Sequence, residues 1–368
     1  MTERLKIAVF DGDGIGPEIT QPTLDILERL AALSGKVSFE FDMLPAGAAH
    51  YAKTGESLPA ASLKAADAAD AILLSAMGDP AIRYPDGTEI SPQIDLRKEF
   101  GLYLGLRPVT VLPGQPTPLR LPEGRQIDFM LIRESTEGLF WSMGRGEVSH
   151  DQASERLVIT RGISEKLFRQ AFRLARRRKE TGRGPGRVTC VDKANVFRAF
   201  AFFRSVFREE AQNHPDLEAD CAYVDATALK MVQAPWDLDV MVTENMFGDI
   251  LTDEASVITG SIGMLPSASL ADRGPGLYEP IHGSAPDIAG RGVANPCGAV
   301  LSAAMLLRHS LGLEAEARAV EEATWATVAR GIGTADVVGK GATARSTAEV
   351  TAAIAAALEE APAARAIA

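Results

Sequence analysis

Leu238-Asp-Val-Met-Val242 and Asn245-Met-Phe-Gly-Asp-Ile-Leu-Thr-Asp-Glu254 predict a buried strand that leads into a helix. Asp249 and Asp253 are four residues apart, so on a helix they share one face. Two such carboxylates repel each other unless a cation lies between them, and carboxylate oxygens suit Mg²⁺ or Mn²⁺. A solvated helix face is the alternative, but the adjacent Gly248 and apolar residues favour a pocket wall. The segment therefore predicts half of a metal site.

The same order of strand and helix recurs along the chain. Strands are expected at residues 7–10, 71–75, 127–132, 188–191 and 238–242, and helices at 17–33, 164–177, 194–210, from 295–296 onward, and at 350–360. This alternation predicts an α/β fold with a substantially parallel sheet. The Gly-rich segment at residues 11–18, Asp-Gly-Asp-Gly-Ile-Gly-Pro-Glu, lacks the G-x-G-x-x-G spacing. It predicts a tight strand-to-helix turn that lines a cleft, not a classical Rossmann fingerprint.

Length and composition restrict the class of protein. A chain of 368 residues with 46% hydrophobic content is long enough for two domains, or for one large α/β unit with an insertion. Its net charge of -11 argues against a nucleic-acid or anionic-membrane partner. Neither an export signal at the amino terminus nor an apolar segment of bilayer-spanning length is found. The sequence therefore predicts a cytoplasmic protein.

Two further features of composition concern cysteine and arginine. Cys190, Cys221 and Cys297 are widely spaced, which predicts packing residues in a reducing compartment and neither a disulfide framework nor a zinc site. A basic run at residues 176–179 precedes the Gly/Pro-rich segment 181–186. Alone it could bind nucleic acid, but in an acidic protein a solvated helix end with an exposed turn is the stronger interpretation.

Three arginines could bind an anionic substrate. Arg97, Arg107 and Arg133 each carry a planar guanidinium group that matches a carboxylate. Singly, each could instead form a surface ion pair. Arg133 is distinguished because it ends the buried-looking strand at residues 127–132, at the carboxyl end where α/β proteins bind ligands.

Other polar residues stand at strand ends and in a loop. Lys193 follows the strand at 188–191 and could act as a proton shuttle, or could be an ordinary lysine with its amine in water. Asp225 supplies a third acid near a strand end. The turn-rich loop at residues 279–288, with His282, could approach a phosphate or an adenosine closely.

Together these segments resemble the β-decarboxylating dehydrogenases, the family of isopropylmalate, isocitrate, homoisocitrate and tartrate/D-malate dehydrogenases. The likeness runs from residues 12–18 to Gly339. It is most specific at residues 245–270, which include Asp253-Glu-Ala-Ser-Val-Ile-Thr-Gly-Ser-Ile-Gly-Met-Leu-Pro-Ser-Ala-Ser269. The 3-isopropylmalate and tartrate dehydrogenases are the most similar members.

The resemblance implies an isopropylmalate/isocitrate dehydrogenase-like two-domain α/β fold with a large mixed sheet, unlike a classical Rossmann fold. Residues 1–100 with 260–368 would form the larger domain, which carries the cofactor-binding loops. Residues 101–259 would form the smaller domain, with the dimer interface, metal ligands and catalytic residues.

The resemblance also implies a role for each site residue. The malate carboxylates of the substrate would be held by Arg97, Arg107 and Arg133. The ligands of Mg²⁺ or Mn²⁺ would be Asp225, Asp249 and Asp253. The cofactor would be held by His282, Gly283, Ser284, Ala285, Asp287, Ile288 and Asn295. Asp287 would lie on the adenosine ribose, where its charge repels the 2'-phosphate of NADP, so NAD is expected. Lys193 would relay a proton, and it would reach the site with Asp225 from the second subunit of a homodimer. The implied reaction is oxidation and decarboxylation of a (2R)-malate-type 2-hydroxy diacid similar to 3-isopropylmalate.

Two departures from the family pattern bear on this expectation. Phe140 stands where relatives have a Tyr that helps to protonate the enol, and a phenyl ring cannot donate a proton. Water or Lys193 would then substitute, or the reaction would slow or stop before CO₂ loss. Ser91 and Gln93 replace the Leu-Leu pair that lines the isopropyl pocket, which favours a polar substrate such as tartrate, D-malate or an isocitrate-like acid. A non-catalytic or regulatory paralogue is a further alternative.

Overall fold

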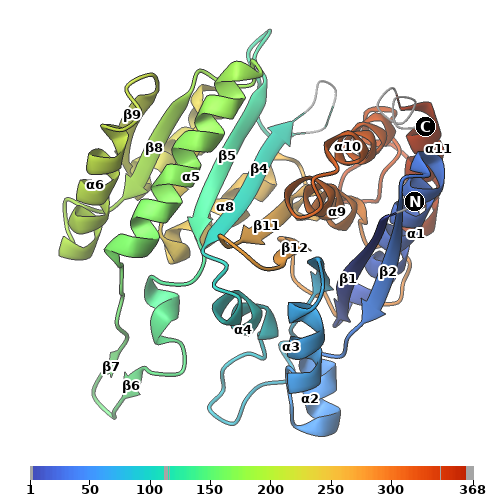
Figure 1. Ribbon diagram of the computed structural model, residues 1–368, viewed down its shortest axis with the longest axis horizontal. Helices are drawn as coiled ribbons and strands as arrows, with labels where there is room; N and C mark the ends of the chain where they lie inside the picture. Colours follow the sequence, from blue (N-terminus) through green and yellow to red (C-terminus); the bar gives the residue numbers. More distant parts are fainter. Residues whose placement is uncertain (1–2, 112–114, 116, 340, 362–368) are drawn as a thin grey trace. The chain divides into compact units, whose positions relative to one another are not determined.

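A computed structural model describes residues 3–111, 115, 117–339 and 341–361 (Figure 1). The chain forms two compact units. The first runs to Phe100 and resumes at Thr259, and the second comprises Gly101–Val111 with Leu119–Ile258.

The first unit contains a mixed five-stranded arrangement covered by helices. Its elements are β1 (Glu3–Gly12), α1 (Gly16–Ser34), β2 (Val37–Met43), α2 (Ala48–Thr54), α3 (Ala60–Asp67), β3 (Ala71–Ala76), α4 (Pro92–Glu99), η3 (Ile262–Met264), β11 (Pro266–Leu270), β12 (Gly276–Pro280), α9 (Cys297–His309), α10 (Glu314–Ala329) and α11 (Thr347–Glu360). The strand order is β2-β1-β3-β12-β11, with only β11 antiparallel to its neighbour β12. Helices α1 and α9 pack on the strands. Helix α10 packs against α9, and α11 packs against α1 and α10.

The second unit repeats this plan with five other strands. Its elements are β4 (Leu104–Val111), β5 (Ile127–Glu134), η1 (Leu139–Ser142), β6 (Glu147–Val148), β7 (Ala153–Ser154), α5 (Arg161–Glu180), β8 (Arg187–Asp192), α6 (Arg198–Ala211), β9 (Glu218–Tyr223), α7 (Val224–Gln233), η2 (Pro235–Asp237), β10 (Val240–Thr243) and α8 (Asn245–Ile258). The order is β4-β5-β10-β8-β9; β4 is antiparallel to β5 and the other pairs are parallel. In Figure 1, α5 and α6 lie in front of these strands and α8 behind them. Strands β6 and β7 form a separate hairpin.

The expected α/β class and mixed strand arrangement are confirmed. Each of the five expected helices begins one to four residues from its expected position, and two of these shifts have a visible local cause. The helix expected from residue 194 begins at Arg198, because the N–H groups of Val196 and Phe197 both bond to the carbonyl oxygen of Lys193 in a turn. The helix expected from 295–296 begins at Cys297, whose N–H donates to Asn295 Oδ1 at 3.0 Å.

Aromatic side chains join α5 to α6. The ring of Phe168 lies 4.6 Å from that of Phe203 and 5.2 Å from that of Phe207, between centroids. Phe172 stacks on Phe207 at 5.5 Å. Such pairs add to the free energy gained by burying the rings, so they fix how the two helices cover the strands.

The Gly-rich turn between β1 and α1 allows backbones to approach closely. A Cβ atom added at Gly12 would lie 1.8 Å from the carbonyl oxygen of Ala76, and one at Gly14 would lie 2.0 Å from that of Ser284. Both glycines have positive φ, 71° and 57°. The N–H of Ile15 donates to the same Ser284 oxygen at 2.7 Å. The expected tight turn is therefore present, and it holds the loop that contains Ser284.

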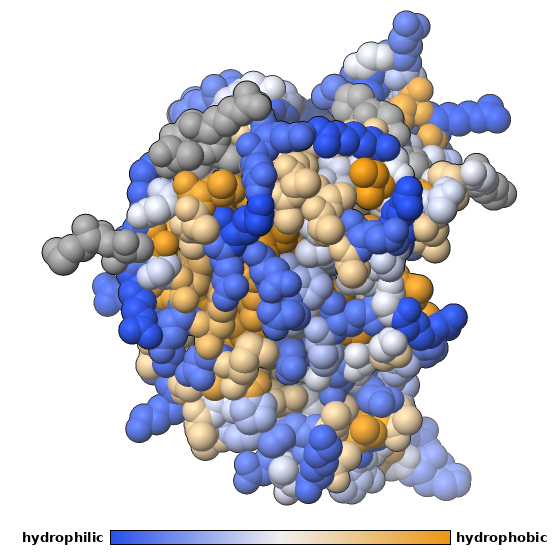
Figure 2. Space-filling model, turned by 90° about the vertical axis from the view of Figure 1, so that its right-hand side faces the viewer, coloured by the Kyte–Doolittle hydropathy of each residue, from blue (hydrophilic) through white to orange (hydrophobic). Residues whose placement is uncertain are grey.

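One face of the molecule carries polar and apolar areas side by side (Figure 2). In Figure 2, hydrophilic side chains cross and divide the apolar areas of the visible face. None of the helices in the described part of the chain has the length and apolar character that a membrane crossing requires.

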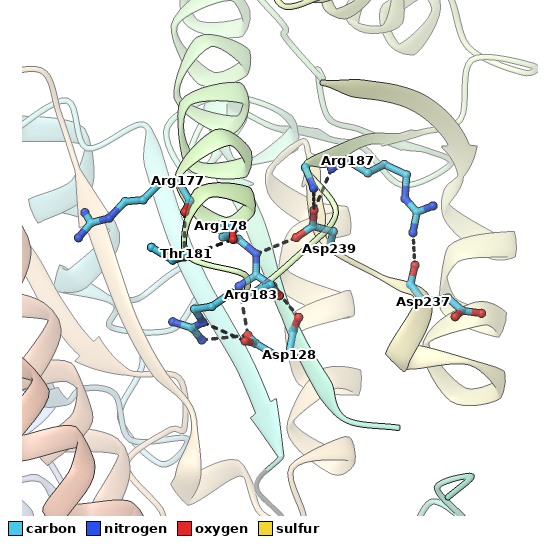
Figure 3. A network of polar contacts seen from close by, with 9 residues as sticks. Asp128, Arg177, Arg178, Thr181, Arg183, Arg187, Asp237 and Asp239 are labelled. Atoms are coloured by element: carbon cyan, nitrogen blue, oxygen red, sulfur yellow. Dashed lines mark hydrogen bonds and ion pairs between the residues drawn. The ribbon is translucent and has the colours of Figure 1, made fainter. Parts of the chain in front are cut away.

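Arg178 departs from the expected solvated helix end, because its side chain is buried (Figure 3). Its Nε donates to Asp239 Oδ1 at 2.7 Å and its Nη1 donates to Asp128 Oδ1 at 3.1 Å. Asp239 Oδ2 also accepts the N–H groups of Gly186 and Arg187 at 2.9 and 2.8 Å. The expectation is wrong at this residue: Arg178 ties the Gly/Pro-rich segment to the strands.

Replacing Arg178 by Met should destabilise the protein strongly. Loss of the guanidinium leaves Asp239 buried without its cation, and breaking a buried pair on one side costs about 3–5 kcal/mol. The matched control is Arg177→Met, one residue earlier on an exposed position, where we expect a change below about 0.5 kcal/mol. Urea unfolding of both variants measures the difference; equal free energies of unfolding would contradict a structural role for Arg178.

Candidate functional site

The amino-terminal end of α8 is fixed by a buried carboxylate. Glu244 precedes the helix and accepts the N–H groups of Met246 at 3.1 Å and Phe247 at 2.8 Å. Burial raises the pKa of Glu244, and these hydrogen bonds act in the opposite direction. The helix start is therefore capped by a side chain, which fixes the direction in which its first residues point.

Asp249 and Asp253 lie on one face of α8, as the sequence predicts. Burial raises the pKa of Asp253, and the negative charge of Asp249 raises it further, whereas Arg133 lowers it. Two carboxylates on one helix face offer oxygen ligands to a hard cation, which would relieve the repulsion between them. The donor set of α8 thus fits a divalent metal.

Arg133 lies at the end of β5 and is 5% exposed. Its Nε donates to Asn245 Oδ1 at 2.9 Å, and its Nη1 forms an ion pair with Asp249. The guanidinium carbon lies 5.2 Å from the centroid of the Phe140 ring. Gly248 makes room for this side chain, because a Cβ there would lie 2.7 Å from Arg133 Cγ. The Phe140 ring therefore packs against the Arg133 guanidinium, and it has no hydroxyl group that could donate a proton.

Arg107 occupies the neighbouring strand. It is 2% exposed and lies opposite Leu131, while Gly105 lies opposite Arg133. Because paired residues of antiparallel strands project to the same side, Arg107 and Arg133 share the face of β4 and β5 on which α8 packs. The structure thus brings Arg133 together with Asp249 and places Arg107 on the same face of the strands.

Lys193 and Asp225 form a separate pair at the ends of β8 and β9. Lys193 Nζ donates to Asp225 Oδ1 at 2.6 Å, and this bond lowers the pKa of Asp225. The Asp225 side chain remains 68% exposed. Within the described residues, no cluster of three or more His, Cys, Asp or Glu side chains could hold a metal ion. The grouping of Asp225 with Asp249 and Asp253 stays a prediction.

Arg97 lies in the first unit, on α4. Its Nη2 donates to Glu279 Oε1 at 2.5 Å, and both side chains are buried. Its Nε is also buried and has no hydrogen-bond partner among the described residues. A buried donor without a partner is costly, so this nitrogen is suited to an anionic ligand. Nearby in sequence, Ser91 immediately precedes α4, and the Oε1 atom of Gln93 is likewise buried without a partner in the described structure.

The loop predicted to hold the cofactor follows β12. His282 Nδ1 lies 2.9 Å from the Gly283 carbonyl oxygen, while its Nε2 is buried without a partner among the described residues. Burial lowers the pKa of His282, which favours the neutral imidazole. Ser284 donates to the carbonyl oxygen of Gly78, and Ala285 has a positive φ of 40°. An orphaned ring nitrogen and a strained backbone suit a loop that binds a ligand.

The remaining cofactor-loop residues differ in their surroundings. Asp287 is exposed, and Ile288 is partly buried against a cluster that includes Ile15 and Ile19. Asn295 donates to Asp336 Oδ2 at 3.0 Å, so part of its hydrogen-bonding capacity serves the fold. Asp287 is thus accessible to a ligand, whereas Asn295 is already held in place.

Several supporting residues were not found by sequence reasoning. They are Glu134, Glu244, Asn245, Glu279 and Asp336. Glu134 accepts the N–H groups of residues 136 and 137, and burial raises its pKa to about 7. Of these residues, only Glu244 had a local sequence signal, because an acidic residue directly before a helix is typical of a helix cap.

The fold and these paired groups define an α/β protein with buried arginines beside carboxylates near the ends of its strands. The family model described as isocitrate/isopropylmalate dehydrogenase matches residues 6–354. The chain belongs to this family, whose members are decarboxylating oxidoreductases that generally use NAD and a divalent metal.

Known relatives agree with this assignment. A 3-isopropylmalate dehydrogenase of Anaeromyxobacter dehalogenans is 46% identical over 343 residues, which cover 91% of this chain and 95% of the relative. A 3-isopropylmalate dehydrogenase of Halalkalibacterium halodurans is 41% identical over 362 residues, which cover 96% of this chain and 98% of the relative. Among solved structures, an isocitrate dehydrogenase from Methylococcus capsulatus gives a TM-score of 0.84 at 33% identity, covering 96% of this chain and 99% of that chain.

Introducing a methyl group at Gly248 should impair the enzyme by displacing Arg133. The Cβ of Gly248→Ala collides with Arg133 Cγ, so the bonds to Asn245 and Asp249 cannot both persist. A lost charge-assisted hydrogen bond is worth about 1.5–3 kcal/mol, so kcat/KM should fall about 10- to 100-fold. Steady-state kinetics with a malate-type substrate provide the measurement.

Gly162→Ala is the matched control, because a Cβ at this helical glycine of the same unit meets nothing within 4 Å. We expect wild-type kinetics from it. Unchanged kcat/KM in Gly248→Ala would show that the site does not depend on this placement of Arg133.

Proposed function

We propose that the protein catalyses NAD-dependent, metal-dependent oxidation and decarboxylation of a (2R)-malate-type 2-hydroxy diacid similar to 3-isopropylmalate. The observation that carries the proposal is the buried Arg133 between Asn245 and Asp249, with Arg107 on the same face. Buried guanidinium groups beside paired carboxylates suit a dicarboxylate bound together with a cation.

The chain's own residues then have distinct tasks. Arg107 and Arg133, with Arg97, would hold the substrate carboxylates through bidentate hydrogen bonds. Lys193 would accept the hydroxyl proton and return a proton after CO₂ leaves, since Phe140 has none to give. When bound, a Mg²⁺ or Mn²⁺ ion held by Asp225, Asp249 and Asp253 would stabilise negative charge on the substrate, and NAD would accept the hydride.

Support for NAD comes from the loop after β12. His282 has a buried nitrogen without a described partner, and Asp287 is exposed. A carboxylate at residue 287 can accept hydrogen bonds from ribose hydroxyls but repels a 2'-phosphate. His282, Gly283, Ser284, Ala285, Ile288 and Asn295 would complete the binding loop. The relatives' names, 3-isopropylmalate dehydrogenase, support the substrate class.

A homodimer formed through the second unit, acting in the cytoplasm, is part of the proposal. Apolar side chains that are more than half exposed gather on two neighbouring helices: Leu229 and Val232 on α7, and Ile250 and Val257 on α8. Exposed apolar residues in such a group favour association with another surface. A second copy would bring its Lys193 and Asp225 to the helical aspartates, and the domain of residues 101–259 would be the dimerising one.

A second candidate function rests on Gln93. Its buried Oε1 has no partner among the described residues, and an isopropyl group cannot supply one. A hydroxyl side group, as in tartrate, would donate to it directly. The carboxylate side group of an isocitrate-like acid would reach it through a bridging water, and D-malate, which has no side group there, would leave room for such a water. The same residues would then serve a more polar malate.

A small substrate panel tests the proposed function. With NAD and Mn²⁺, we expect NADH formation from 3-isopropylmalate and from polar malates, little activity with NADP, and none after chelation of the metal. Gln93→Leu should raise the ratio of kcat/KM for 3-isopropylmalate over tartrate about 10-fold or more, because the orphaned oxygen is removed. Absence of NADH with every acid would instead favour a regulatory paralogue.

Subunit mixing tests whether active sites are shared. Arg133→Ala and Lys193→Ala should each be nearly inactive, because each lacks a residue required in every site. After the two are unfolded together and refolded, mixed dimers should regain up to about a quarter of wild-type activity, since half of the dimers are mixed and each has one intact site. Refolded single variants are the controls, and no recovery would contradict shared sites.

A further inference from the structure

Two cysteines of the second unit face each other on neighbouring strands. Cys190 on β8 is the register partner of Cys221 on β9 in a parallel pair. Adjacent strands lie about 4.8 Å apart, and disulfides form across Cα separations of roughly 4.4–6.8 Å. Because register partners project to the same side, the two thiols lie within bonding reach after a small shift. Among the strands of the described residues, β9 stands at one end of the order and has a neighbour on one side only, so it can shift.

The surroundings favour a reactive sulfur at Cys221. Arg204 on α6 forms two hydrogen bonds of 2.7 Å to the buried Asp192, and its guanidinium carbon lies 4.9 Å from the centroid of Tyr223. Contact with Cys190, together with Arg204 and Arg208, lowers the pKa of Cys221 to about 7, against the effect of partial burial. Cys221 is also partly exposed, so a thiolate there is both populated at neutral pH and accessible.

Cys190 has the complementary properties. It is fully buried, and burial raises the pKa of its thiol. Its Sγ lies 3.7 Å from Asp192 Oδ2, on the same side of β8. Cys297 differs from both, since it begins α9 in the first unit, and burial raises its pKa to about 12. The chain thus holds one accessible thiolate, one buried thiol beside it, and an unreactive third cysteine.

We propose that Cys190 and Cys221 form a peroxide-reactive dithiol that closes reversibly into a disulfide between β8 and β9. This modification is independent of the proposed substrate. Cys297 is buried as a packing residue would be, whereas the proposal gives Cys190 and the partly exposed Cys221 a chemical role beyond packing.

The chemistry is balanced with a hydroperoxide as oxidant. The Cys221 thiolate attacks one oxygen of hydrogen peroxide, the O–O bond breaks, and the products are a sulfenic acid and hydroxide. The Cys190 sulfur then attacks the sulfenic sulfur; the S–O bond breaks, and the leaving hydroxyl departs as water with the Cys190 proton. In total two thiols lose two electrons and two protons, and one peroxide becomes two waters. A dithiol reductant reverses the change.

Peptide mapping of the peroxide-treated full chain tests the proposal. Trypsin cleavage after Arg187, Lys193, Arg208 and Lys230 places Cys190 in peptide 188–193 and Cys221 in peptide 209–230. We expect these peptides to appear linked, lighter by two hydrogen masses than the free pair, and to separate after dithiothreitol. Cys297→Ala should give the same linked pair in the same yield.

Two variants make the assignment specific. Cys221→Ser should lose the linkage and leave Cys190 alkylatable only after denaturation. Cys190→Ala should also lose it, but Cys221 should instead gain one or two oxygen masses, because no thiol remains to resolve the sulfenic acid. Circular dichroism of each variant checks folding. Linkage through Cys297, or alkylation of both Cys190 and Cys221 when wild-type protein is treated with peroxide in the folded state and then denatured, would overturn the proposal.

Discussion

The site of the second unit depends on satisfying one buried guanidinium group. Arg133 cannot be buried at the end of β5 unless its charge and donors are matched, since an unpaired buried charge costs several kcal/mol. Asn245, Asp249 and the Phe140 ring provide that match. Because both polar partners lie in the first turns of α8, the start of this helix must lie directly against β5. The glycine at position 248 follows from the same requirement.

Two other ion pairs with buried carboxylates hold β8 and its neighbour β10 at opposite ends. Arg178 and Asp239 join the segments that lead into β8 and β10, and Arg204 with Asp192 closes the carboxyl end of β8. Buried pairs contribute little net stability compared with apolar packing, but they tolerate few alternative geometries. The strand end that precedes Lys193 is thereby fixed in position, which is what a site of several charged groups requires.

Local pattern explains which features were predictable. Apolar runs located the strands that end at Arg133 and Lys193, and helical periodicity placed Asp249 and Asp253 on one face. The partners of the arginines were not predictable, because Glu279 is 182 residues from Arg97 and Asn245 is 112 residues from Arg133. The basic run at 176–179 misled for a related reason: an exposed and a buried arginine look alike until their distant carboxylates are known.

The separation of Lys193 and Asp225 from the helical aspartates bears on how the metal site could be completed. Asp249 and Asp253 offer carboxylate oxygens from a single helix, whereas Mg²⁺ requires six ligands in near-octahedral geometry. Asp225 is bonded to Lys193, and its side chain is largely exposed. An exposed carboxylate on a surface that also exposes Leu229 and Val232 on α7 is suited to meet a second copy. Dimerisation would then supply a metal ligand and a proton carrier in one step, which makes catalytic competence conditional on assembly.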